Sequence, residues 1–245
     1  MTRNHCYTAL ILRSRPSGES NRDAWLLTGE AGLIRATVFG GPKSKLRAYA
    51  EPFHSGQAWV YHDPVKDTRK LADFDVRDWR PGLRELYERA MVADALAETI
   101  LASHGGGGNW AGVLSLAEAS LDAMTLADSE TCARLLLQFM WQWADFLGLR
   151  PEFDCCSLCG KPLPQDSVSW YSPREGGMVC DGCHDHGSLL EACPGCRRWL
   201  QTVLALPPAQ LARYTLDGRS FQEAKSLATT ILAEALGKRL ASWDC

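Results

Sequence analysis

Residues 156–183 decide the fold of the C-terminal half, and they read CSLCGKPLPQDSVSWYSPREGGMVCDGC. A Cys-x-x-Cys doublet stands at each end, Cys156/Cys159 and Cys180/Cys183, with 20 residues between the two doublets. Two thiolates three residues apart on a tight turn can face one ion, and a second such turn completes a tetrahedron of sulfurs. The pattern therefore predicts a zinc ribbon-like module.

The predicted metal is structural rather than catalytic. Four thiolates leave no coordination position for water, and one structural Zn²⁺ contributes on the order of 10–16 kcal/mol of apparent binding energy. The segment between the doublets holds few large apolar residues, so we expect it to need the metal in order to fold. His184 and His186 are expected to be surface residues, and the strands of the ribbon to lie at residues 167–171 and 176–179.

A third doublet, Cys193/Cys196, leaves the ligand set open. Combined with Cys180/Cys183 it would leave only nine intervening residues, which is tighter than the common ribbon. We rank this set second, and the third doublet could instead bind a second ion. Buried structural cysteine and a redox Cys-x-x-Cys are the other interpretations, but neither of the first two doublets has a thioredoxin-type strand-to-helix setting.

Composition is that of an ordinary globular protein, with 46% hydrophobic and 22% charged residues. No apolar run approaches the roughly 18 residues of a membrane-spanning helix. The short apolar stretch near the N-terminus is followed by Arg13 and Arg15, unlike a secretory signal. We therefore expect a cytoplasmic protein, and in that reducing compartment paired cysteines are more often metal ligands than disulfides.

The net charge of −3 hides an asymmetry between the two ends of the chain. Residues 1–80 hold 13 basic and nine acidic side chains, whereas the remaining residues hold 13 basic and 20 acidic ones. A basic N-terminal part joined to an acidic C-terminal part suggests two domains with different partners.

The N-terminal part reads as a small barrel. Short segments of strand character are separated by turn signals, and a Gly-Gly-Pro sequence at residues 40–42 ends the third of them. Five short strands within 80 residues are typical of such a barrel. The predicted strands are residues 7–14, 23–28, 33–39, 53–61 and 71–76.

Helical spacing of apolar residues begins at Pro81, so the predicted division is a barrel domain of residues 1–80 and a helical domain of residues 81–245. The zinc module is placed at about residues 152–200 of the second domain. A helix at residues 130–147 is apolar nearly all the way round, so it should be central in its core. Three more helices are predicted. One starts at Pro81, and the other two cover residues 113–126 and 222–243.

Basic side chains at strand ends and in the loop after the third strand are candidate contacts for a phosphate backbone. A solvated surface is the plain alternative for such a cluster. Trp25, Phe39, Phe53, Trp59 and Tyr61 are possible stacking platforms, although most of them should be core residues. The candidate nucleic-acid contacts are Arg13, Arg15, Arg22, Arg35, Lys43, Lys45 and Arg47.

Several segments, in order along most of the chain, resemble the RecO family of bacterial DNA repair and recombination proteins. The most specific of them leads directly into the first cysteine doublet. The segments are YTALIL at residues 7–12, RPSGESNR at 15–22, GGPKSKLR at 40–47, PGLRE at 81–85, FLGLRPEFD at 146–154, the second knuckle at 176–183 and LGKRL at 236–240.

The resemblance implies an N-terminal OB barrel, a helical domain and a zinc module, which makes the chain an α+β multi-domain protein. It further implies a recombination mediator of the nucleoid that is not an enzyme. Such proteins bind single- and double-stranded DNA and anneal complementary strands. With RecR, and often RecF, they replace single-strand-binding protein with RecA.

Two positions depart from the family pattern. Pro42 stands where family members often carry a basic residue, so the loop is expected to contact DNA more weakly. The segment of Cys193 and Cys196 looks additional, which keeps the zinc ligand question open.

Two other function classes remain as alternatives. A zinc hydrolase or nuclease would need an open metal position or a gathered set of catalytic side chains, and the sequence shows no HExxH, P-loop or GxSxG motif. A zinc-containing interaction scaffold with only incidental DNA contact fits the acidic C-terminal part.

Overall fold

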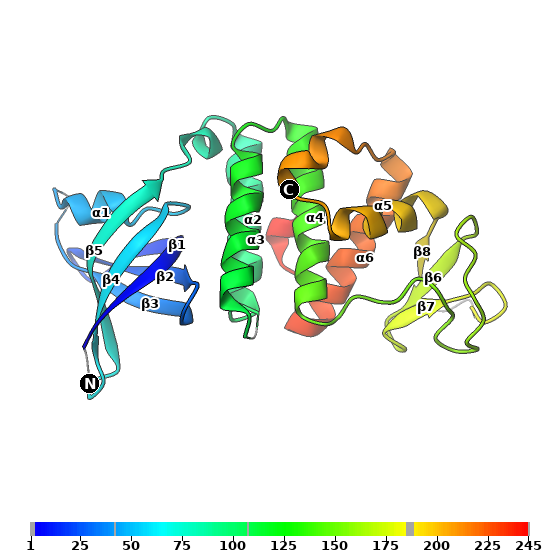
Figure 1. Ribbon diagram of the computed structural model, residues 1–245, viewed down its shortest axis with the longest axis horizontal. Coiled ribbons are helices and arrows are strands. Elements are labelled where there is room, and N and C mark those ends of the chain that lie inside the picture. Colours follow the sequence, from blue (N-terminus) through cyan, green and yellow to red (C-terminus); the bar gives the residue numbers. More distant parts are fainter. Residues whose placement is uncertain (1–2, 42, 107, 185–188, 245) are drawn as a thin grey trace. The chain divides into compact units, whose positions relative to one another are not determined.

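The computed structural model describes residues 3–41, 43–106, 108–184 and 189–244 (Figure 1). Contacts within the chain divide it into two compact units, Met1–Leu126 and Ala127–Cys245. Each unit is described by itself below. Among the helices of the described residues, none combines the length and the apolar character needed to cross a membrane.

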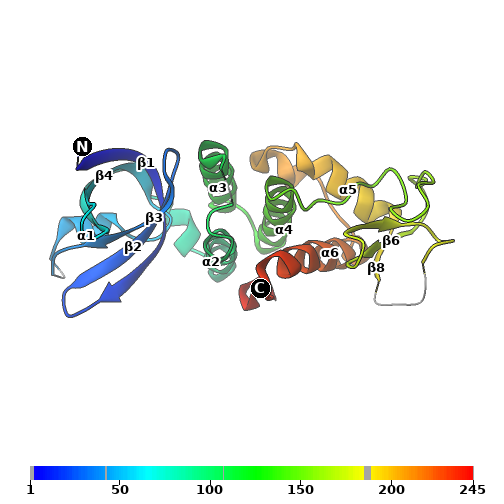
Figure 2. The ribbon, with the colours of Figure 1, turned by 90° about the horizontal axis from the view of Figure 1, so that it is seen from below.

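The first unit contains a closed five-stranded barrel, as the turn-separated strand pattern predicts (Figures 1 and 2). The strands follow one another around the barrel in the order β1-β2-β3-β5-β4, and a short parallel pairing of β3 with β5 closes it. This five-stranded barrel is consistent with the OB type. The strands are β1 Asn4–Ser17, β2 Asn21–Thr28, β3 Gly32–Val38, β4 Ser55–Asp63 and β5 Thr68–Asp78.

Alternation along the strands builds the barrel interior. Ile11, Leu26, Ala36 and Phe74 point inward and are almost completely buried. Strand β1 is longer than predicted and continues through Pro16, which pairs with β2. Proline is tolerated there because β1 pairs with β4 only as far as Leu10, so the other edge of the strand carries no ladder at Pro16.

Two helical predictions for the first unit need correction. The basic segment after β3 is not all loop, because it forms a short helix α1, Lys45–Tyr49. The helix predicted to begin at Pro81 is a 3-10 turn, Pro81–Arg84, followed by α2, Tyr87–Ala102, since Leu86 has extended backbone angles. Helix α3, Trp110–Met124, completes the unit, and the side chain of Asn109 caps its first turn.

Three helices of the second unit lie side by side in both views (Figures 1 and 2). Helix α4 carries the completely buried Trp141 and Trp143, as its apolar sequence predicts. The predicted last helix ends early, at Gly237 in the left-handed conformation, and α5 was not predicted. The helices are α4 Ser129–Phe146, α5 Pro194–Leu204 and α6 Gly218–Leu236, with 3-10 turns at Pro208–Arg213 and Ala241–Asp244.

A small antiparallel sheet completes the second unit, in the order β7-β6-β8. Two of its strands are the predicted ribbon, β6 Ser169–Ser172 and β7 Gly177–Val179. The third strand, β8 Leu190–Ala192, has three residues and no sequence signal of its own, so it was not predicted. It leads directly into α5.

Candidate metal centre and nucleic-acid interface

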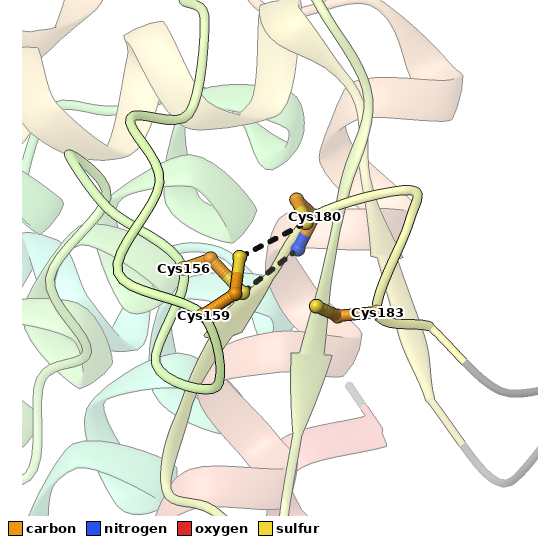
Figure 3. A group of neighbouring side chains, drawn as sticks. All are labelled: Cys156, Cys159, Cys180 and Cys183. Atoms are coloured by element: carbon orange, nitrogen blue, oxygen red, sulfur yellow. Dashed lines mark hydrogen bonds between the residues drawn. The ribbon is translucent and has the colours of Figure 1, made fainter.

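The sulfur atoms of Cys156, Cys159, Cys180 and Cys183 all lie within 4.8 Å of one another (Figure 3). Those of Cys159 and Cys180 are 3.7 Å apart. Zinc–sulfur bonds of about 2.3 Å in a tetrahedron place neighbouring sulfurs about 3.8 Å apart, whereas a disulfide needs about 2.05 Å. The cluster therefore has the chemistry and nearly the dimensions of a four-thiolate zinc site.

The first doublet sits on a turn held by main-chain hydrogen bonds. The N–H of Cys156 donates to the carbonyl of Lys161 at 2.8 Å, and the N–H of Gly160 donates back to the carbonyl of Cys156 at 2.9 Å. Gly160 has a φ of +69°, a left-handed conformation that glycine adopts without strain. The turn therefore needs glycine at the position directly after the second cysteine.

The second doublet follows β7. The N–H groups of Cys183 and His184 both donate to the carbonyl of Cys180 at 3.0 Å, which folds the segment into a tight turn. Gly182, between the two cysteines of this doublet, has open space around its Cβ position, so nothing in the structure requires glycine there.

A direct contact joins the two turns. The N–H of Ser157 donates to the carbonyl of Met178 at 2.8 Å, and its hydroxyl donates to the same oxygen at 3.0 Å. A Cβ on Gly177 would lie 2.9 Å from the Cβ of Ser157, so glycine permits this approach. These contacts between the loop and the strand hold the two turns together, so the fold itself places the four sulfurs close to one another.

The electrostatics of the cluster favour a cation. Burial raises the pKa of Cys156, but the N–H groups of Cys159, Cys180 and Leu158 outweigh it and lower that pKa to about 6. Thiol hydrogen bonds with Cys159 and Cys180 raise the pKa of Cys183 to about 12. One thiolate thus forms readily while a neighbouring thiol keeps its proton, and a divalent cation could replace such protons.

The third doublet lies outside this cluster. Cys193 is the N-cap residue of α5, and Cys196 is buried in the first turn of that helix. The alternative that combined these residues with Cys180 and Cys183 is therefore not brought together by the fold. Cys155 is exposed and pairs with Pro162 in a single β-bridge.

Arg197 on α5 supports the first turn, a role that the sequence pattern does not indicate. Its residue surface is only 2% exposed, and its guanidinium donates to four main-chain carbonyls of the segment around the first doublet. Burial lowers its pKa. An arginine in an amphipathic helix ordinarily reads as a solvated residue, so no sequence signal marked it. The carbonyls are those of Phe153 at 2.9 Å, Leu163 at 3.3 Å, Pro164 at 2.9 Å and Ser167 at 3.1 Å.

His184 lies against the second turn rather than among the sulfurs. Its ring stacks on Trp170 with centroids 4.2 Å apart, and its Nδ1 lies 2.8 Å from the carbonyl of Asp181. His186 lies outside the described residues, as does Pro42.

Three of the predicted DNA-contacting arginines share the outer face of the barrel. Arg13 and Arg35 are both cross-strand neighbours of Trp25, and Arg15 is the neighbour of Asp23. Directly opposed residues of antiparallel strands point to the same side, so these side chains form one surface across β1, β2 and β3. We call these five residues the outer face.

The charges of the outer face are unequal. Arg35 lies over the ring of Trp25 at 5.6 Å and contacts Asp23 at 2.5 Å. Burial alone would raise the pKa of Asp23, but hydrogen bonds from Arg35, Thr37 and Ser17 lower it, so the carboxylate stays charged. Much of the Arg35 charge is therefore balanced within the protein, whereas Arg15 is exposed.

The remaining predicted contacts lie elsewhere in the same unit. Arg22 forms an ion pair with Glu51 at 2.5 Å. Lys43 and Lys45 are exposed beside and within α1, and Arg47 is half-buried on the same helix. We call Lys43, Lys45 and Arg47 the α1 group.

The candidate stacking residues differ in how exposed they are. Only Phe53 of these five aromatics is buried, so the expectation that most of them belong to the core is wrong. Phe39 is 48% exposed, and the ammonium of Lys70 lies 5.1 Å from the centre of its ring. Trp59 is exposed, and Trp25 and Tyr61 are half-buried.

Comparison with known families accounts for both ends of the chain. The model of the family described as "Recombination protein O N terminal" matches residues 1–76, and that of "Recombination protein O C terminal" matches residues 84–244. The chain belongs to the RecO family. The two RecO matches flank residue 80, whereas the compact units of the structure divide after Leu126, because α2 and α3 pack with the barrel.

Relatives of this RecO-family chain align along nearly its whole length. A protein of Heliobacterium modesticaldum named "DNA repair protein RecO" is 29% identical, over 96% of this chain and 86% of its own. The protein of that name from Rubrobacter xylanophilus is 28% identical, over 93% of this chain and 91% of its own. The protein of that name from Anaeromyxobacter sp. (strain K) is 29% identical, over 96% of this chain and 92% of its own.

Proposed function

We propose that this chain is a mediator of DNA repair and homologous recombination that binds DNA through its barrel and holds one structural Zn²⁺ in its second unit. The observation that carries the proposal is the match of both RecO family models, which together span nearly all of the chain. The DNA repair and recombination role follows from family membership. The contacts and steps below are our inference.

The barrel supports DNA binding by its chemistry. Cations beside aromatic rings combine attraction for phosphates with a surface on which bases stack. The outer face has this combination at Trp25 and Arg35, and Phe39 with Lys70 repeats it. Strands two and three of OB folds are the usual oligonucleotide surface, so we assign the outer face and the α1 group to single- and double-stranded DNA.

The cysteine cluster supports a structural ion. The four residues Cys156, Cys159, Cys180 and Cys183 would hold Zn²⁺ with every coordination position filled, which supplies cross-linking rather than activation of water. Mediation without catalysis by the chain itself agrees with such a closed site.

The partners follow from the family assignment. We propose that the chain anneals complementary strands and acts with RecR, and in some settings with RecF, to load RecA onto DNA coated with single-strand-binding protein. A protein with this role works at the nucleoid, in the cytoplasm.

Two triple variants test the DNA-binding assignment. One replaces Arg13, Arg15 and Arg35 by alanine, and the other replaces the α1 group by alanine. Each phosphate contact to single-stranded DNA adds about 0.7 to the salt slope, so losing the three contacts of the α1 group should lower the slope by about 2 and the affinity in about 0.1 M salt by about a hundredfold. The variant of Arg13, Arg15 and Arg35 should lower both by less, because Asp23 already balances much of the Arg35 charge. Fluorescence anisotropy with labelled oligonucleotides over a salt series measures both quantities.

The matched control removes three exposed cations of the second unit, Arg174, Arg213 and Lys238, also to alanine. We expect its affinity and salt slope to stay near those of the unchanged protein. The proposal is wrong if both triple variants bind single-stranded DNA as the control does. A loss confined to one triple assigns DNA to that group alone, and the loss should be similar for unrelated base sequences.

A further inference from the structure

The Cys193/Cys196 doublet has a setting unlike that of the four clustered cysteines. Strand β8 ends at Ala192, and α5 begins at Pro194, so the doublet spans a strand-to-helix junction. A Cys-x-x-Cys sequence at the start of a helix that follows a strand is the arrangement of redox-active dithiols. The sequence at this junction is Cys193-Pro194-Gly195-Cys196.

The sulfur of Cys193 lies against the main chain of Cys196. Cys193 is the N-cap of α5 with φ −68° and ψ 164°, and its sulfur accepts the N–H of Cys196 at 3.4 Å. Residues three apart on a helix have Cβ atoms about 5–6 Å apart, and a disulfide needs about 3.5–4.5 Å. Disulfide formation therefore requires the first turn to adjust so that the two Cβ atoms come closer together.

The surroundings make the two thiols unequal. Cys193 is 9% exposed, and its sulfur lies 3.3 Å from the hydroxyl of Ser220 on α6. Cys196 is 0% exposed, and burial, with Cys193, Glu223 and Asp217 nearby, raises its pKa. Glu223 also accepts the N–H of Cys193 at 2.7 Å. Both cysteines are buried, but Cys193 at the helix start is less deeply buried than Cys196 a turn further in, an order that suits an attacking and a resolving cysteine.

We propose that Cys193 and Cys196 form a reversible redox pair that closes to an intrachain disulfide by exchange with low-molecular-weight disulfides. The thiolate of Cys193 attacks one sulfur of the small disulfide and expels one small thiol. The thiolate of Cys196 then attacks the Cys193 sulfur of the mixed disulfide and expels the second. The two cysteines lose two electrons and two protons, and the small disulfide gains them as two thiols.

This modification site is separate from the metal site but linked to it through the sheet. Ala192 of β8 pairs with Ser169 of β6, and Trp170 of β6 pairs with Val179 of β7, directly before Cys180. Metal-bound thiolates are held by the ion, so in the zinc-loaded protein the third doublet is the pair available for oxidation. The proposal thus predicts oxidation without loss of zinc.

Peptide mass spectrometry on the full, zinc-loaded chain tests the proposal. The protein is equilibrated in glutathione buffers of increasing oxidised fraction, the remaining thiols are alkylated, and zinc per chain is measured on the same samples. We expect the peptide that contains residues 193–196 to lose two hydrogens and two alkylation sites while zinc stays at one per chain. The exposed Cys6 should instead remain alkylated or carry glutathione alone.

Two variants identify the order of attack. Cys196→Ser should trap glutathione on Cys193, whereas Cys193→Ser, which keeps an oxygen at the N-cap, should leave Cys196 reduced. The redox pair does not exist if both cysteines remain alkylatable throughout the series in the unchanged, folded protein. Oxidation that appears only in parallel with zinc loss would also overturn it, because the doublet would then be reporting unfolding of the metal module.

Discussion

At the scale of single residues, Arg197 illustrates how a buried cation can organise a loop through main-chain carbonyls. Its guanidinium donates to four main-chain carbonyls, and each of them would lose a donor if the side chain were removed. A buried polar group without a partner costs about 1–3 kcal/mol, and the losses at one site are not additive. The neighbouring Arg198 is a useful contrast, because its side chain is 57% exposed.

We predict that Arg197→Met lowers the free energy of unfolding of the zinc-loaded protein by about 3 kcal/mol, since methionine fills the volume and leaves the carbonyls unsatisfied. Arg198→Met, which removes only a surface ion pair to Asp166 at 2.9 Å, should change it by less than about 1 kcal/mol. Urea unfolding followed by tryptophan fluorescence measures both. Equal effects of the two substitutions would show that the carbonyl contacts do not support the fold.

At the scale of elements, α4 caps the end of α5 from outside that helix. The last carbonyls of a helix have no partner within it, and they need donors when buried. The amide nitrogen of Gln142 lies 3.0 Å from the carbonyls of Val203 and Leu204, and that of Gln138 lies 2.7 Å from the carbonyl of Leu206. These two buried glutamines of α4 are therefore part of its packing.

We predict that Gln142→Met lowers the free energy of unfolding by about 1–3 kcal/mol and speeds hydrogen exchange at the C-terminal end of α5. Methionine has nearly the same shape and donates no hydrogen bond, so the change isolates the cap. Gln201→Met, on the exposed side of α5, is the matched control and should leave both quantities unchanged. Unaltered exchange at residues 203–206 in the first variant would contradict the capping role.

At the scale of the whole molecule, the cysteine cluster belongs to the second of two compact units, so metal removal should act on only one of them. We predict that a strong chelator increases hydrogen exchange in peptides from residues 153–200, while peptides from the barrel strands keep their protection. The physical reason is that binding energy of the metal is folding energy for a module with little apolar core. Increased exchange throughout the barrel would contradict this independence.

Measuring the zinc content per chain in cysteine variants shows which cysteines bind the ion. We expect one ion in the unchanged protein, in Cys155→Ser and in Cys196→Ser, and a loss of the ion in Cys183→Ser. A loss with Cys196→Ser but not with Cys183→Ser would show that the third doublet binds the metal. Inductively coupled plasma mass spectrometry on desalted protein gives the ratio directly.

Features that arise from short-range pattern could be predicted from the amino-acid sequence. Alternating apolar residues and turn signals predicted a five-stranded barrel, and the spacing of the first two doublets predicted a cysteine cluster, because both depend on neighbours in the chain. The family resemblance also came from such segments and is confirmed.

Which doublets converge, and which residues support them, depends on long-range packing that the sequence pattern does not reveal. Strand β8 and helix α5 draw Cys193 and Cys196 into a helix start, away from the other sulfurs, and no local pattern marks a strand of three residues. The role of Arg197 was hidden for the same reason, since its carbonyl partners lie 30 or more positions away along the chain. The physical reason is that burial of a charge or a thiol is set by the elements packed over it, and packing depends on the whole fold rather than on adjacent residues.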